Sequence, residues 1–75
     1  MERTIYDYSE LIGLIARYYG TKTAFSEAIG KSKAHVSMIL HNKRYLEQDE
    51  LTKWADALKV ENEDYGRIFF TLKVL

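Results

Sequence analysis

Hydrophobic positions recur along most of this chain at a spacing of three to four residues, which is the period of amphipathic helices. The first run ends at Gly20, and Asp7 and Glu10 have the spacing of a capping box at its start. Its apolar face is formed by Tyr8, Leu11 or Ile12, Ile15 and Tyr19. We therefore predict a first helix before Gly20 with a mainly structural role.

Two shorter helices are predicted next. Thr21 is a suitable N-cap for the first of them, and Gly30 can close it in the left-handed conformation. Ser32 is an N-cap for the second, which ends near residues 41–42. Its apolar positions are Val36, Ile39 and Leu40. Because only three residues separate the two helices, they cannot lie antiparallel, and the pattern predicts a helix-turn-helix over residues 21–42.

The last third of the chain changes character. Leu51, Trp54 and Leu58 predict a fourth helix with an acidic start, and Asn62 can cap a short fifth helix over residues 63–69. Beyond it, Phe70, Leu72 and Val74 alternate with polar residues, which is a strand period. No other segment has this pattern. The tail, residues 70–75, is therefore expected to stay extended in water, to pack on the core, or to pair with the same strand of a second subunit.

A chain of 75 residues has room for a single core, so we expect one domain over residues 1–75. The predicted fold class is all-α, a compact bundle of about five short helices around the helix-turn-helix, with a short C-terminal strand or an extended tail. The sequence contains no cysteine, so disulfides and thiolate metal sites are excluded, and a domain this small depends on packing or on a partner subunit. We see no membrane span or signal peptide in the sequence and expect a cytoplasmic protein.

The net charge is zero, which argues against non-specific coating of nucleic acid. The charges are unevenly distributed, however. Residues 17–44 carry six lysines and arginines against the single acid Glu27, whereas the flanking segments are both acidic. A basic block of this kind is either a solvated face or a binding surface.

The segment TKTAFSEAIGKSKAHVSMILHN, residues 21–42, resembles the helix-turn-helix of the Cro and C1 repressor family of phage and bacterial regulators. The continuation over residues 43–60 resembles the basic loop and fourth helix of that family. The end of the chain is similar to the tail of small regulators from phages and prophages of Gram-positive bacteria. Asn42 stands where the family often has glycine, and asparagine can also adopt the left-handed conformation.

This resemblance implies a dimeric, sequence-specific DNA-binding regulator, a Cro-like repressor of a near-palindromic operator. Residues 33–41 would then form the recognition helix in the major groove. The implied base contacts are Lys33, Ala34, His35, Ser37 and Met38. The implied phosphate contacts are Thr21, Lys22, Ser32, His41, Asn42, Lys43 and Arg44.

A second hypothesis is a protein-binding modulator, an antirepressor that captures another repressor. Its support is the neutral charge together with an apolar tail. Solvent-exposed tail residues would form the contact or a dimer interface, namely Phe69, Phe70, Leu72 and Val74. The antitoxin of a toxin–antitoxin pair combines both activities and is a third possibility. An enzyme is the weakest interpretation, and we assign no catalytic residues, metal or cofactor.

Overall fold

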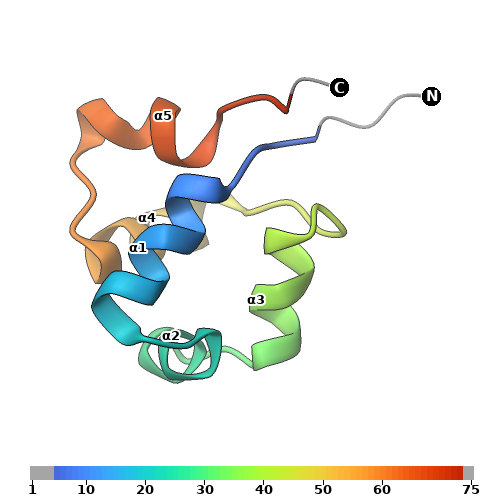
Figure 1. Ribbon diagram of the computed structural model, residues 1–75, viewed down its shortest axis with the longest axis vertical. Coiled ribbons are helices and arrows are strands. Elements are labelled where there is room, and N and C mark those ends of the chain that lie inside the picture. Colours follow the sequence, from blue (N-terminus) through green and yellow to red (C-terminus); the bar gives the residue numbers. More distant parts are fainter. Residues whose placement is uncertain (1–4, 74–75) are drawn as a thin grey trace.

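The computed structural model describes residues 5–73 and consists of five α-helices and one turn of 3₁₀-helix (Figure 1). Helix α1 spans Ser9–Tyr19, α2 spans Lys22–Ile29 and α3 spans Lys33–Leu40. Helix α4 spans Gln48–Leu58, the 3₁₀ turn η1 spans Asn62–Asp64, and α5 spans Tyr65–Phe69. The predicted all-α class is confirmed. No helix within residues 5–73 is long and apolar enough to cross a membrane.

Helices α2 and α3 form the predicted pair joined by a three-residue turn. The Thr21 hydroxyl accepts a hydrogen bond from Ala24 N–H at 3.1 Å, and the Ser32 hydroxyl accepts one from His35 N–H at 3.1 Å. Gly30 closes α2 with a φ of 73°, in the left-handed region where glycine carries no steric penalty. In Figure 1, α2 is seen nearly end-on while α3 runs up the page, so the two helices cross steeply. Both N-caps and the turn glycine are confirmed.

The core is built where α1, α2, α4 and α5 converge. Phe25 of α2 packs edge-on against Trp54 of α4 with ring centroids 5.0 Å apart, and Tyr19 of α1 also packs edge-on against Phe25, with centroids 5.3 Å apart. The Tyr19 hydroxyl donates to the Ala57 carbonyl at 2.9 Å. The other fully buried large side chains are Phe69, Leu11, Ile15, Ile39, Leu58 and Val36. Helix α3 contributes its Val36 and Ile39 to this core and leaves its opposite side in solvent.

The C-terminal tail finds a partner within its own chain. Lys73 N–H donates to the Ile5 carbonyl at 2.9 Å, and Asp7 N–H donates to the Thr71 carbonyl at 2.7 Å. These bonds flank an isolated antiparallel bridge between Tyr6 and Leu72. The expectation that no segment of the chain could pair with the tail is therefore wrong. The N-terminal residues before α1 serve as its partner, so residues 5–7 and 71–73 lie side by side (Figure 1).

Two predicted caps differ in the structure. Asp7 accepts from Ser9 N–H at 3.0 Å, but Glu10 forms an ion pair with Arg67 of α5 instead of bonding back to Asp7. The predicted capping box is wrong, because the Asp7 N–H that Glu10 would accept from donates to the Thr71 carbonyl of the tail. Asn62 does not cap a helix but begins the 3₁₀ turn η1, and the following helix α5 is shorter than predicted.

Candidate functional site

The solvent side of α3 brings together five residues at positions i, i+1, i+4, i+5 and i+8. We call this surface the α3 face, formed by Lys33, Ala34, Ser37, Met38 and His41. Met38 is a large apolar side chain that is 39% exposed, and Lys33 is the one lysine or arginine of the face. Ser37 lies within 3.3 Å of the His41 ring, Oγ to Nδ1. Four of the five predicted base-contact residues thus lie together on one accessible surface.

His35, the fifth predicted base-contact residue, is turned toward the interior. Its Nε2 lies 2.7 Å from Oε2 of Glu50 on α4, and the two side chains are only 13% and 8% exposed. A buried carboxylate needs such a partner, because an unpaired charge in a dry environment is strongly unfavourable. The expected base contact by His35 is therefore not supported by the structure. The pair instead fixes α3 to the start of α4.

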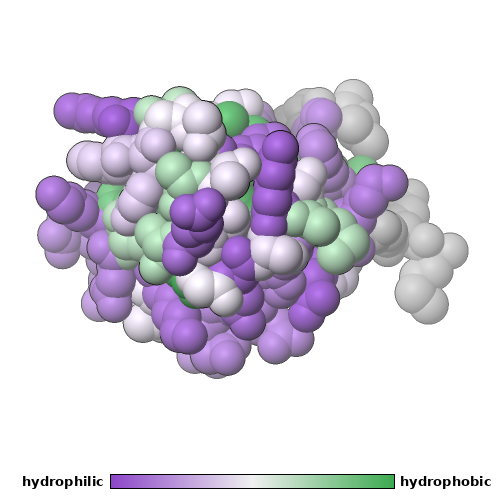
Figure 2. All heavy atoms as spheres, turned by 90° about the horizontal axis from the view of Figure 1, so that it is seen from below, coloured by the Kyte–Doolittle hydropathy of each residue, from purple (hydrophilic) through white to green (hydrophobic). Residues whose placement is uncertain are grey.

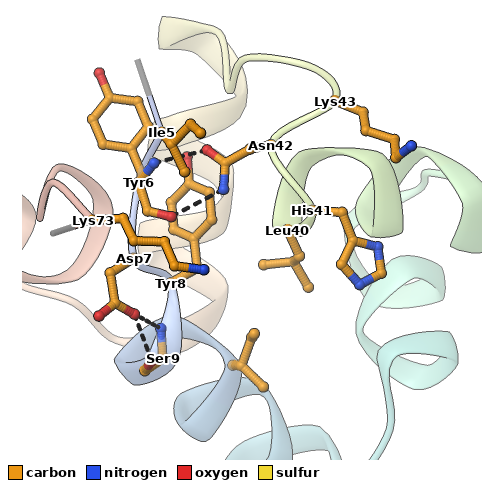
Figure 3. Close-up of a pocket in the computed structure, with 11 residues that line it drawn as sticks. Ile5, Tyr6, Asp7, Tyr8, Ser9, Leu40, His41, Asn42, Lys43 and Lys73 are labelled. Atoms are coloured by element: carbon orange, nitrogen blue, oxygen red, sulfur yellow. Dashed lines mark hydrogen bonds between the residues drawn. The ribbon is translucent and has the colours of Figure 1, made fainter. Parts of the chain in front are cut away.

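Asn42 follows α3 and also has an intramolecular role. Its φ of 61° confirms the expected left-handed conformation. The Asn42 Oδ1 accepts from Tyr6 N–H at 2.8 Å, and its Nδ2 donates to the Tyr6 carbonyl at 2.9 Å (Figure 3). The side chain reproduces the pairing of a neighbouring strand and ties the N-terminal segment to α3. Its amide is thus engaged by Tyr6, and the expected phosphate contact by Asn42 is not supported.

The remaining predicted phosphate-contact residues surround the same side of the molecule. Lys43 and Arg44 are exposed in the loop after α3, and Lys22 is half-buried at the start of α2. The hydroxyls of Thr21 and Ser32 are used as helix caps. Figure 2 views the molecule from the α2 end and shows a surface that is mainly hydrophilic, with smaller apolar areas between.

An open cleft of about 570 Å³ lies beside the α3 face, between the end of α3 and the segment Ile5–Ser9 (Figure 3). Its α3 side carries Leu40, His41 and Lys43, and Lys73 of the tail extends into it. Ile12 of α1, 40% exposed, also lines this cleft and a smaller hollow of about 210 Å³ that reaches Thr21 and Lys22. Exposed apolar side chains thus lie beside lysines in this part of the surface.

Two ionisable side chains of the cleft have pKa values that differ from their ordinary values. Hydrogen bonds from the Ser9 hydroxyl and N–H hold the pKa of Asp7 below its ordinary value, with a smaller contribution from Lys73. Burial raises the pKa of the Tyr8 phenol, because the charged form is disfavoured away from water. Asp7 is therefore a carboxylate at neutral pH and Tyr8 a neutral phenol. Within residues 5–73 no cluster of three or more His, Asp or Glu is arranged to hold a metal ion.

Of the tail residues predicted to be exposed, the structure buries one and exposes two. Phe69 is 1% exposed and belongs to the core, so the expectation that it is solvent-exposed is wrong. Phe69 is the last residue of α5, and its side chain is buried. The sequence pattern had placed this residue directly before the extended tail, residues 70–75. Phe70 and Leu72 are 47% and 62% exposed, and Val74 lies outside the described residues.

Sequence reasoning missed three residues of this site. Ile5 and Ile12 line the cleft, and Tyr6 binds Asn42. Of these three residues, only Ile12 could have been found from the sequence. It follows Leu11, and only one of two consecutive residues can lie at the centre of the buried face of a helix. Nothing in the local pattern connects Tyr6 with Asn42, which is 36 residues away.

The fold and this surface define a small all-helical domain built around a helix–turn–helix pair, of the kind found in regulators. The chain belongs to the DUF739 family, described as proteins of unknown function, whose model matches residues 4–72. Among curated proteins no match was found. Among solved structures, the chain is similar to the modulator of repression (MOR) of the temperate bacteriophage TP901-1 from Lactococcus lactis, determined in solution. The two chains are 37% identical, with a TM-score of 0.80 over 93% of this chain and 95% of that chain. Membership of the Cro and C1 family stays a prediction.

Proposed function

We propose that this protein is a small phage-type regulator that binds a repressor protein and modulates its activity, with the α3 face and the adjoining cleft as the contact surface. The observation that carries the proposal is the composition of that surface. Met38 and Ile12 expose apolar area beside a face that carries a single lysine, whereas binding to DNA depends mainly on contacts to its phosphates. Exposed methionine is typical of surfaces that bind other proteins.

The electrostatics of the chain support the same proposal. Its net charge is zero, and the α3 face carries one lysine. Two of the other polar side chains expected to contact DNA, His35 and Asn42, are held by Glu50 and Tyr6. Affinity for DNA rests mainly on neutralised phosphates, so a chain without net charge is expected to bind DNA weakly outside its local basic block. The likeness to a phage protein named as a modulator of repression favours a repressor as the partner.

Sequence-specific DNA binding is the second candidate function. Its support is the spacing of the helix–turn–helix pair, with Lys33, Ala34, Ser37 and Met38 on one accessible side of α3. Lys22, Lys43 and Arg44 border that side and would contact the phosphates. In this case the protein would act as a Cro-like repressor. The antitoxin hypothesis combines the two surfaces and shares both tests.

The proposal is tested by titrating the full chain into the purified repressor encoded by the same phage genome, with calorimetry as the readout. Met38→Asp places a charge at the centre of the α3 face, and we expect it to weaken binding by about tenfold or more. Leu72→Asp is the matched control, since Leu72 is also an exposed apolar residue but lies in the tail. We expect it to bind like the unmodified chain.

The opposite pattern would contradict the proposal. Loss of binding with Leu72→Asp and none with Met38→Asp would place the contact on the tail. In parallel, selection from a random duplex pool at low salt tests the second candidate. A near-palindromic sequence that is enriched by the chain and lost with Lys33→Ala and Ser37→Ala would establish DNA reading in place of repressor binding.

A further inference from the structure

Gly13 lies in the middle of α1, on its solvent side, where the fold does not require a glycine. Its φ lies outside the left-handed region, and a Cβ at this position would meet no atom within 4 Å. Glycine is less favourable than alanine inside a helix, because its backbone loses more conformational freedom on folding. The helix is thus weakened at a point where any ordinary helix former would fit.

Gly13 lines a groove of about 410 Å³ between α1, the C-terminal end of α4, and α5. Apolar groups line much of it, and Tyr18 stands at one end with 42% of its surface exposed. The other apolar residues of the groove are Leu14, Leu58, Val60 and Ile68. This groove is separate from the cleft beside α3, and α3 lies on the other side of the molecule in Figure 1.

Acidic and basic side chains lie at opposite ends of the groove. At the acidic end, Glu10 and Asp64 both pair with Arg67, which leaves one net negative charge. At the basic end, Arg17 and Lys59 lie 5.7 Å and 5.6 Å from the centre of the Tyr18 ring. Glu10 and Arg17 are seven residues apart on one face of α1, with Gly13 and Leu14 midway between them.

We propose that a second copy of this chain occupies the groove, with the two α1 helices packed antiparallel about a twofold axis at Gly13 and Leu14. In this arrangement Arg17 of each copy faces Glu10 of the other, so the acidic end of one groove meets the basic end of the second. A twofold interface must be complementary to itself, and the charge pattern of α1 has this property. Gly13 removes the side chain at the crossing point, which lets the two helix backbones approach closely.

This pairing differs from the tail-mediated dimer suggested by the sequence, and it does not depend on the proposed function. The groove shares no lining residue with the cleft beside α3, so both copies keep the α3 face accessible. A dimer of this geometry would present two partner-binding surfaces at once, which raises the apparent affinity for a dimeric partner.

Sedimentation equilibrium of the full chain over a range of concentrations tests the proposal, with Gly13→Gln as the main variant. Glutamine is a better helix former than glycine and fills the groove. We expect the melting temperature to rise by about 3 °C while the dimer dissociation constant increases about tenfold or more. Gly66→Gln is the matched control, because Gly66 of α5 is also exposed with open space at its Cβ but does not line the groove. We expect its dimerisation to be unchanged.

Charge reversal provides an independent readout. Glu10→Arg and Arg17→Glu each place like charges across the twofold axis, so each variant alone should be monomeric at concentrations where the unmodified chain is dimeric. Mixing the two variants should restore a dimer, because each then faces an opposite charge. A chain that is monomeric throughout, or a dimer that Gly13→Gln and both reversals leave unchanged, would overturn the proposal.

Discussion

Asn42 shows how one side chain can serve both a turn and a distant segment. Its left-handed backbone ends α3, and its amide makes two hydrogen bonds with the backbone of Tyr6. The turn could be predicted from the sequence, because asparagine tolerates this conformation. The bonds to Tyr6 could not, because they depend on how the N-terminal segment lies in the folded chain.

Separate substitutions of Asn42 should resolve these two roles. Asn42→Gly keeps the turn but removes both hydrogen bonds, and we expect the free energy of unfolding to fall by about 1–3 kcal/mol. Asn42→Ala loses the same bonds but keeps a Cβ in the left-handed region, so it should cost about 1 kcal/mol more than Asn42→Gly. Urea unfolding measures both. Equal stability of Asn42→Gly and the unmodified chain would show that the link to Tyr6 contributes nothing.

The pair formed by His35 and Glu50 makes a second residue-scale prediction. His35→Ala leaves the Glu50 carboxyl buried without this partner, and we expect a loss of about 2 kcal/mol in the free energy of unfolding. The double variant His35→Leu with Glu50→Leu should lose less than the sum of the two single changes, because it removes both polar groups together. Thermal unfolding of the four proteins completes the cycle. Strict additivity would contradict a coupled pair.

At the scale of elements, local signals predicted the helices well. Thr21, Gly30 and Ser32 act within their own turns, so their residue types were sufficient to locate α2 and α3. The alternation at the tail predicted a short strand or an extended segment, and the structure has a single bridge there, between Leu72 and Tyr6. Its partner was missed because the N-terminal residues before α1 are too few to show a period of their own.

The end of α4 offers a prediction at this scale. Lys59 closes the helix with a φ of 58°, a conformation in which glycine has no steric penalty. We expect Lys59→Gly to raise the free energy of unfolding by up to about 1 kcal/mol, as measured by urea unfolding. Lys59 also lies over the exposed Tyr18 ring, a contact that is worth less in solvent. A loss of stability on this change would show that the ring contact outweighs the backbone strain.

At the scale of the whole molecule, the distribution of charge and apolar surface matters more than any single motif. The sequence correctly placed a basic block in the middle third, and the structure brings Lys22, Lys33 and Lys43 to one side of the chain. It could not show that Ile12 stays exposed near them, since this exposure depends on how the helices pack together. This mixture, on a chain without net charge, is the basis for proposing a protein partner.

The most direct test of that proposal is a competition measured by fluorescence anisotropy. A labelled operator duplex is first saturated with the repressor that the chain is proposed to bind, and the full chain is then added. We predict that the chain releases the operator by binding the repressor, and that Met38→Asp fails to do so. Anisotropy that stays high because the repressor remains bound, or rises because the chain itself binds the operator, would contradict the account.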